Sequence, residues 1–301
     1  MFPALGLWFL FEKSHLKNKN IFMKSRNLVL FSAAALLVGF SSCKKSASAA
    51  DEYETTFELS ADQGIADNLT QDANDVLNEA AIDQNVMGGR GTETTQTTNT
   101  LSCATITVTP ASGFPKTMLI DFGTGCTSNN GVARSGKITV VLSDSLRKSG
   151  STAVMTFDNY YVNAYKKEGT ITWTNTSTAT VKSWQRKVEN GKITAPNGNY
   201  WLHSGVRDIV QTAGASTPLN LLDDVYSITG NHTVTNAAGS TRTCTVLTAL
   251  EKKTTCSNID MGTVKVQGPN HYAIVDFGNG ACDNIATISI DGRPSRTFLL
   301  R

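Results

Sequence analysis

Residues 152–174 read TAVMTFDNYYVNAYKKEGTITWT. Apolar and polar side chains alternate along this stretch, and β-branched and aromatic residues are frequent, as is typical of half-buried strands. Asn and Gly residues, which favour turns, interrupt the alternation near positions 159 and 169. The stretch therefore predicts three consecutive strands, at 152–158, 160–166 and 168–174.

The same period-two pattern runs from Leu101 to the C-terminus. Because the runs are short and no helical segment separates them, the pattern favours antiparallel neighbours joined by short turns. We expect an all-β domain over residues 101–301, folded as an antiparallel sandwich or as a long curved meander. The other strands are predicted at 103–109, 116–122, 136–143, 178–188, 205–212, 224–230, 240–250, 262–267, 271–277, 284–290 and 295–300.

Residues 51–100 precede this domain as an acidic helical segment and a linker. Ten acidic side chains lie between Asp51 and Asp83, and apolar residues recur at intervals of three and four, which predicts an amphipathic helix. Ser60 is the expected N-cap, and Gly88-Gly89 is the expected stop. The apolar stripe is expected to pack on the β domain, with binding to a partner as the alternative. Its members are Ile65, Leu69, Ala73, Val76, Leu77, Ala80 and Ala81.

Residues 23–43, MKSRNLVLFSAAALLVGFSSC, join a basic start to an apolar run and a small-residue ending on Cys43. The apolar run is shorter than the roughly 20 residues that span a membrane, and is typical of a processed signal peptide. We expect residues 1–42 to be a signal region whose translation begins at Met23, and residues 43–50 to be a lipidated tether. Acyl chains on Cys43 would hold the chain at a membrane. An ordinary secretory signal with a chance cysteine is the alternative.

The mature chain expected from Cys43 onward has 22 basic and 24 acidic side chains, because residues 1–42 carry five basic residues and one acidic residue. Its length is sufficient for a sizeable core. The small net charge and the lack of a basic cluster give no indication of nucleic-acid binding.

One motif occurs twice, as LIDFGTG at 119–125 and IVDFGNG at 274–280. In each copy we expect the aspartate to accept backbone N–H bonds and the glycines to take positive φ. The residues concerned are Asp121, Gly123 and Gly125 in the first copy, and Asp276, Gly278 and Gly280 in the second.

Each copy is preceded and followed by a cysteine, and disulfides form readily in an exported protein. We predict the pairs Cys103–Cys126 and Cys256–Cys282, with Cys244 free. The cysteines show no CxxC spacing, and His203, His232 and His271 lie at no ligand-like interval from them, so we expect neither a metal site nor a cofactor.

The candidate catalytic motifs lack their usual companions. Asp-Phe-Gly stands without a glycine-rich phosphate loop or an H-R-D motif, which argues against a kinase. Calcium binding at Asp121, Asp276 and Asp283 is less favoured than turn capping. His203-Ser204 lacks a nucleophile elbow, and Asp223-Asp224 is either a glycosidase carboxylate pair or an acidic turn.

Aromatic residues are concentrated in the middle third of the chain. An exposed row on a β surface could stack sugar rings, and a concave one could hold a lipid. Packing in the core and between strands is the favoured interpretation. The residues are Tyr160, Tyr161, Tyr165, Trp173, Trp184, Tyr200 and Trp201.

The ending Phe40-Ser41-Ser42-Cys43, the two D-F-G-x-G turns with their cysteines and the Cys282-Asp283-Asn284 run resemble uncharacterised lipoproteins of the Bacteroidota cell envelope. The resemblance implies anchoring in the outer membrane through the N-terminal lipid, with the periplasmic or surface side left open. It implies nothing about the ligand, and a glycan, a lipid and an envelope protein are the candidates. We expect a non-enzymatic lipoprotein with a binding or scaffolding β domain. The alternatives are a polysaccharide-acting enzyme and a lipid or lipoprotein carrier with an apolar cavity.

Overall fold

The computed structural model describes residues 49–88 and 94–300. This part of the chain forms one long helix, α1 (Ala49–Asp83), a short 3-10 helix, η1 (Leu221–Asp223), and fourteen strands. The strands are β1 (Thr105–Thr109), β2 (Lys116–Asp121), β3 (Cys126–Thr127), β4 (Ala133–Leu142), β5 (Thr152–Val162), β6 (Tyr165–Asn175), β7 (Ser183–Thr194), β8 (Tyr200–Ala213), β9 (Val225–Asn236), β10 (Thr241–Lys253), β11 (Met261–Gln267), β12 (Tyr272–Asn279), β13 (Ile285–Ile290) and β14 (Arg296–Leu299).

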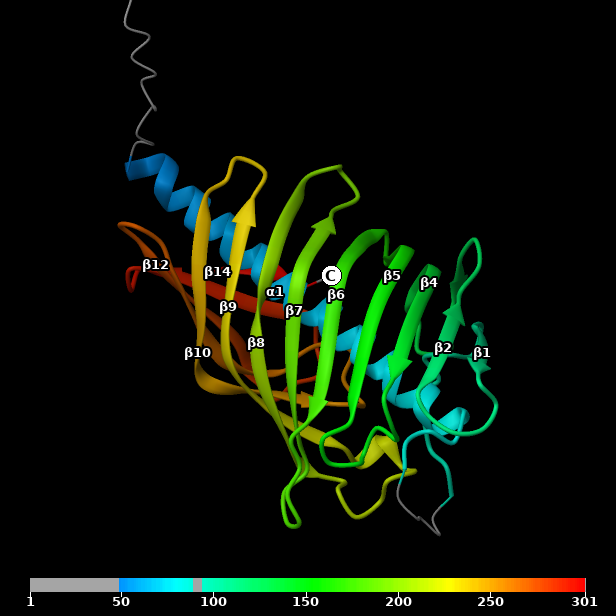
Figure 1. Cartoon of the computed structure of the whole chain (residues 1–301). Helices are drawn as coiled ribbons and strands as arrows, with labels where there is room; N and C mark the ends of the chain where they lie inside the picture. The colour runs from blue at the N-terminus through cyan, green and yellow to red at the C-terminus, as the bar shows by residue number, and fades with distance from the viewer. Residues whose placement is uncertain (1–48, 89–93, 301) are drawn as a thin grey trace, which may run out of the picture. The chain divides into compact units, whose positions relative to one another are not determined.

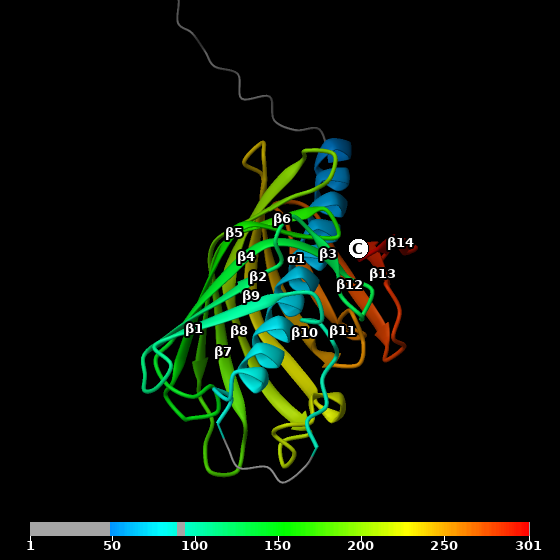
Figure 2. The same ribbon diagram turned by 90° about the vertical axis from the view of Figure 1, so that its right-hand side faces the viewer.

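The strands form a single antiparallel sheet in which neighbours along the chain pair with each other. The exception is β3, which pairs with β4 beside the main path. Figure 1 shows the strands following one another across the sheet, and Figure 2 shows the sheet curling around the helix. The prediction of an all-β fold with a preceding helical segment is confirmed. Of the two predicted architectures the long curved meander is formed, and the sandwich is not.

Close backbone approaches inside the strands bend this sheet. A Cβ atom at Gly136 in β4 would lie 2.0 Å from the carbonyl oxygen of Asn159 in β5, and one at Gly169 in β6 would lie 2.6 Å from that of Asn190 in β7. The strand pairing shifts register at both places. Because such bulges increase the bend and twist of a sheet, they allow the meander to wrap around α1.

The prediction of three strands over residues 152–174 is wrong, because β5 and β6 are two longer strands. Asn159 and Gly169 lie inside them at φ values of 45° and 109°. The turn falls instead at Asn163 and Ala164, which also have positive φ. Residues that commonly end a strand act here as irregularities within one, so the strands run on past them.

The predicted start of the helix is also wrong, since α1 begins at Ala49 and not at Ser60. Ser60 lies inside the helix, where its hydroxyl donates to the carbonyl oxygen of Thr56 at 2.6 Å. A serine can make this bond in a helix interior, so its presence alone does not mark a cap. The helix ends at Asp83, before the predicted glycine stop, and Asn85 follows with a φ of 54°.

The described part of the predicted linker lies against the body of the protein. Gln96 forms an isolated bridge with Asn220. The Thr98 hydroxyl and the Thr100 N–H donate to the Glu79 carboxylate of α1, at 3.1 and 2.9 Å. The segment after the helix is therefore bound to it by hydrogen bonds.

Helix α1 fills the concave face of the sheet. The predicted apolar stripe is buried, with Leu69, Ala73 and Val76 inaccessible to solvent. Polar residues of the helix, including Asn68 and Gln71, are buried as well. The helix therefore packs on the body with most of its surface and not with a single stripe.

Basic side chains from the concave face meet the acidic side chains of α1. Breaking one such pair would leave a buried charge uncompensated, which disfavours other placements of the helix. The pairs are Arg134–Asp72 at 2.7 Å, Arg207–Asp67 at 3.0 Å, Arg242–Glu52 at 3.2 Å and Lys252–Asp75 at 3.1 Å.

Candidate functional site

The two related turns share one hydrogen bond between the aspartate and the first glycine. Asp121 Oδ1 accepts a hydrogen bond from the Gly123 N–H at 2.7 Å, and Asp276 Oδ1 accepts one from the Gly278 N–H at 2.9 Å. Both glycines of each motif have positive φ. Each carboxylate therefore closes its own turn, and Asp283 makes a similar bond to the N–H two residues on.

Both predicted disulfides are formed, Cys103–Cys126 and Cys256–Cys282. Their sequence separations are 23 and 26 residues, and closing loops of this length contributes about 3 kcal/mol each. Cys244 is the free cysteine within residues 49–88 and 94–300, and it is buried. Burial raises the pKa of its thiol to about 12, which makes it unreactive.

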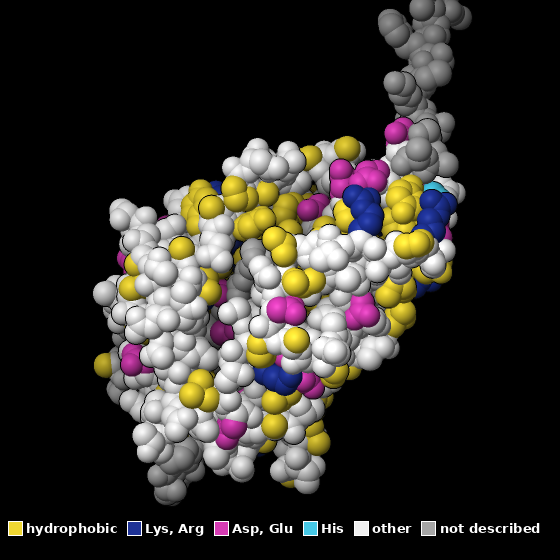
Figure 3. All heavy atoms as spheres, turned by 180° about the vertical axis from the view of Figure 1, so that it is seen from behind, with side chains coloured by type: hydrophobic (Ala, Val, Ile, Leu, Met, Phe, Trp, Pro, Cys, Tyr) yellow, Lys and Arg dark blue, Asp and Glu magenta, His cyan; other side chains and the backbone are white. Residues whose placement is uncertain are grey.

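A polar crevice of about 370 Å³ lies beside α1, between the start of the second disulfide loop at Cys256 and the segments that flank the first. Asp72 and Asp75 of the helix line it, together mostly with hydroxyl and amide side chains such as Thr97, Asn99 and Thr255. The crevice opens on the side of the molecule drawn in Figure 3, where the surface is hollowed and acidic side chains lie in the hollow.

The carboxylates of the crevice are neutralised from inside the protein. Arg134 pairs with Asp72, and Lys252 pairs with Asp75. Burial raises the pKa of Asp75, although Lys252 acts to lower it. Lys252 also donates to the carbonyl oxygen of Cys256 at 2.6 Å, and Arg134 reaches the Thr100 carbonyl at 3.4 Å. The crevice thus offers neutral hydrogen-bonding groups, and its carboxylates are not free to hold a cation.

Asp223 and Asp224 form an acidic turn. Asp223 ends η1 and is exposed, whereas Asp224 is 4% exposed. The Asp224 carboxylate accepts bonds from Gln211 Nε2 at 2.6 Å and from the Tyr226 hydroxyl at 2.8 Å. Burial raises its pKa to about 7, against the opposing effect of the Tyr226 hydrogen bond. Both oxygens of Asp224 are therefore held by neighbouring side chains.

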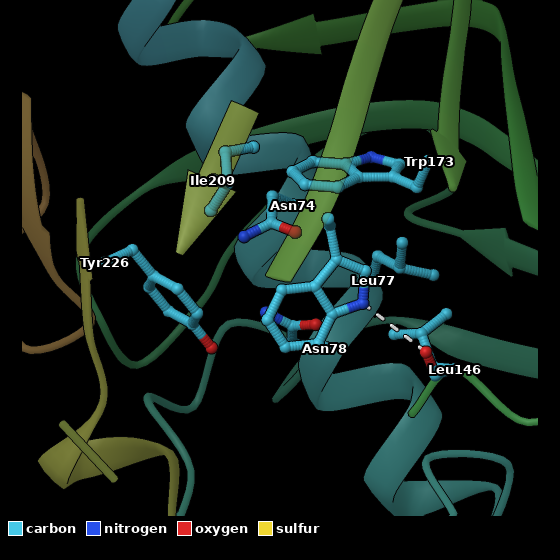
Figure 4. A pocket seen from close by; sticks show the side chains of 8 residues that line it. Asn74, Leu77, Asn78, Leu146, Trp173, Ile209 and Tyr226 are labelled. Carbon is cyan, nitrogen blue, oxygen red and sulfur yellow. Dashed lines mark hydrogen bonds between the residues drawn. The ribbon is translucent and has the colours of Figure 1, made fainter. Parts of the chain in front are cut away.

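The cavity nearest to this carboxylate is small and lined by aromatic residues (Figure 4). Trp173, Trp184 and Tyr226 surround it with Asn74 and Asn78 of α1. The Trp184 Nε1–H donates to the Leu146 carbonyl at 3.4 Å. Its volume is about 20 Å³, which accommodates about one water molecule and is too small for a sugar ring. An aromatic-lined cleft with two catalytic carboxylates is not formed here.

His203 and Ser204 point to opposite faces of β8. His203 is buried 6.3 Å from His232, measured between ring centroids, and Ser204 bonds to Thr233 on the outer side. Burial lowers the pKa of both histidines. None of their ring nitrogens has a hydrogen-bond partner among the described residues. The His–Ser pair is therefore not a nucleophile and its base.

The aromatic row predicted from the sequence is divided between the core and the surface. Tyr160, Trp173 and Trp201 are at most 5% exposed, whereas Tyr161 and Tyr200 are 36% and 38% exposed. Tyr165 and Trp184 are half-buried. Most of these side chains pack in the interior, and no continuous exposed row is formed within the described residues.

Sequence reasoning missed two residues beside the second disulfide. Asp260 Oδ2 lies 3.2 Å from Cys256 Sγ and 3.1 Å from Lys253 Nζ. In the described ranges, Cys256, Asp260 and Cys282 are the one group of three potential metal ligands that lies close together. The two sulfurs are bonded to each other, so they are not available as ligands. The Cys-x-x-x-Asp spacing could have indicated the contact of Asp260 with Cys256. This spacing does not indicate a metal site or a cofactor.

The basic residues of the concave face were missed as well. Arg242 and Cys244 occupy same-face positions of β10, and both are buried. Strand side chains alternate between faces, so a basic residue two positions from a buried apolar residue lies on the same face. This spacing could have predicted that Arg242 is buried. The lipidation site Cys43 and the signal region 1–42 lie outside the described residues.

Comparison with protein-family models, with curated proteins and with solved structures finds no match to this chain. No helix in the described ranges is both long and apolar enough to cross a membrane.

Proposed function

We propose that the protein is a non-enzymatic, lipid-anchored lipoprotein of the outer envelope whose β domain binds a neutral polar ligand. The observation that carries this proposal is the filled concave face. A curved sheet that carried a lipid would hold it there, yet α1 occupies that space and is fixed by buried ion pairs. Binding is therefore assigned to the outside of the domain.

The polar crevice beside α1 is the surface best suited to a ligand. Its hydroxyl and amide groups can both donate and accept hydrogen bonds. The second disulfide fixes its border at Cys256, so little ordering is required there when a ligand binds. A glycan of the envelope has matching hydroxyl chemistry, and an envelope protein or a lipid head group are the other ligands to be tested.

The test uses the mature chain with the substitution Cys43→Ala. Its binding to glycans is measured on an array, and any bound lipid is extracted from the purified protein. Glycan binding is expected, and Thr255→Trp, which fills the crevice, should abolish it. Thr229→Trp is the matched control, since Thr229 is an exposed threonine of β9 outside the crevice. Extraction of a lipid, or polysaccharide turnover lost on Asp224→Asn, would overturn the proposal.

Anchoring is tested separately in cells. We expect the wild-type chain to incorporate labelled palmitate and to stay in the membrane fraction after a salt wash. Cys43→Ala should lose both properties, because several acyl chains are needed for stable attachment. A Cys43→Ala protein that remains in the washed membranes would contradict lipid anchoring.

A further inference from the structure

The second disulfide is asymmetric in its exposure. Cys256 is 2% exposed, whereas Cys282 is exposed in the loop between β12 and β13. Thiol–disulfide exchange proceeds by attack of a thiolate on one sulfur, and access decides which sulfur is attacked. An incoming thiolate therefore reaches Cys282, and Cys256 is the sulfur that leaves.

A half-buried ion pair lies beside the leaving sulfur. Asp260 is 1% exposed, and its Oδ2 lies 3.2 Å from Cys256 Sγ. Lys253 Nζ is 3.1 Å from the same oxygen and also donates to the Gly280 carbonyl at 3.0 Å. The charged group in contact with the leaving sulfur is therefore a carboxylate, whose charge Lys253 offsets.

One oxygen of the Asp260 carboxylate accepts no hydrogen bond from the described residues. Asp260 Oδ1 is buried and has no hydrogen-bond partner among the described residues. Leaving a buried acceptor unsatisfied costs about 1 to 3 kcal/mol. Oδ1 can therefore carry a proton while Oδ2 stays bonded to Lys253.

We propose that Cys256–Cys282 is a thiol–disulfide exchange site for a cysteine-bearing peptide of a partner protein, with Asp260 as the group that accepts the proton of Cys256 when the internal disulfide re-forms and then passes it to solvent. In the forward step a partner thiol releases its proton to solvent, its thiolate attacks Cys282 Sγ and the S–S bond breaks. Cys256 leaves as a thiolate and takes up a proton from solvent. The products are a mixed disulfide on Cys282 and a Cys256 thiol.

The reverse step closes the cycle without another reagent. The Cys256 thiol gives its proton to Asp260, and the resulting thiolate attacks Cys282 Sγ of the mixed disulfide. The partner leaves as a thiolate and the internal disulfide is restored, so no net oxidation occurs. The result is a reversible covalent link to a partner, which adds to a binding function and involves no turnover.

A recess beside Cys282 fits such a peptide. It has a volume of about 230 Å³ and is lined by residues of β12, β13 and their loop, including Phe277, Ala281 and Ile285. Ile285 is 45% exposed. An apolar side chain next to the partner's cysteine could therefore be buried there during exchange.

The test follows exchange with reduced glutathione on the intact mature protein. Cys256→Ser should leave a Cys282 thiol that forms a stable adduct with oxidised glutathione. In the wild type, glutathione should be released from Cys282 by Cys256. Asp260→Asn should slow this release by about tenfold or more, since a general base contributes about 10²-fold or more.

Two controls separate chemistry from folding. Asp260→Glu should recover part of the rate, which a merely structural role would not produce, and Asp121→Asn should leave it unchanged. If Asp260→Asn does not fold, Asp260→Glu decides the matter, because the longer side chain displaces the carboxylate and should slow release. Release as fast as in the wild type in either variant would overturn the proposal.

Discussion

The two D-F-G-x-G turns share one hydrogen bond and positive φ at both glycines, and they have different surroundings. In each, the aspartate accepts the N–H of the first glycine, and Phe122 and Phe277 are buried to the same degree. Cys103 and Cys126 are both half-buried. Within the described residues, no carboxylate or histidine lies within 4.8 Å of both of their sulfurs. The comparison teaches that the motif determines the shape of the turn, while the adjoining strands determine the chemistry of its disulfide.

The regions around the two disulfides are also bound to α1 in different ways. Arg134 of β4 pairs in register with Cys126, and Lys252 of β10 donates to the Cys256 carbonyl. Arg134 reaches Asp72 with two nitrogens, at 2.7 and 3.1 Å, and both side chains are almost fully buried. Lys252 bonds to Asp75 with a single ammonium, and the Asp75 side chain is 13% exposed. A bidentate guanidinium pair is the stronger and more directional of the two. The stability of the region around the first disulfide should therefore depend more on Arg134 than the second region depends on Lys252.

The largest expected effect comes from removing these cations. Arg134→Met should lower the free energy of unfolding by about 3 to 5 kcal/mol, because Asp72 is left as an uncompensated buried charge. Lys252→Met should lower the free energy of unfolding by a smaller amount. Urea denaturation of both variants measures the difference. Lys137→Met is the control, since Lys137 forms an exposed ion pair on the same strand as Arg134, and it should change little. A larger loss in Lys252→Met would reverse the comparison.

Next in size is the removal of each disulfide. Cys103→Ser/Cys126→Ser and Cys256→Ser/Cys282→Ser should each lower the free energy of unfolding by about 3 kcal/mol, because the closed loops have nearly equal lengths. Thermal or urea unfolding of the two double variants gives the values. Losses that differ by more than about 1 kcal/mol would show that the two staples are not equivalent in stability.

The similarity of the turns, the two disulfides and the antiparallel meander could be predicted from the sequence. Those features depend on local signals: cysteine spacing, turn residues and period-two alternation. The strands around Asn159 and Gly169 could not, because a bulge and a turn use the same residue types. The contact of Asp260 with Cys256 and the burial of Arg134 depend on tertiary packing, which local patterns do not encode.

A smaller effect on the free energy of unfolding tests the backbone conformation at the first glycine of each motif. Gly123 and Gly278 have φ values of 61° and 98°, and an alanine at either position should lower the free energy of unfolding by about 1 kcal/mol. Gly278→Ala should cost more, because its φ lies farther from the left-handed region that alanine can occupy. Chemical denaturation measures both. An unchanged stability in either variant would contradict the turn geometry.

The smallest effects concern pH, and they have opposite signs in the two regions. The Gly123 N–H and then Lys137 lower the pKa of Asp121, so its contribution to stability is present above pH 3.8 and is lost as pH falls through the lowered value. Burial raises the pKa of Asp75, so its contribution is present below pH 3.8 and is lost as pH rises through the raised value.

Relative to wild type, Asp121→Asn should therefore lose stability as pH rises from 3, and Asp75→Asn should gain it. Urea denaturation at a series of pH values measures both differences. Parallel pH profiles for the two variants would contradict these assignments.

The most direct measurement of the difference between the turns is the rate at which each disulfide opens in the same wild-type molecule. The mature protein is treated with reduced glutathione, quenched at intervals and alkylated, and the peptides of both disulfides are quantified by mass spectrometry. The Cys256–Cys282 bond should open faster than Cys103–Cys126, because Cys282 is exposed to the attacking thiolate whereas Cys103 and Cys126 are half-buried. Equal rates, or faster opening of Cys103–Cys126, would contradict the account.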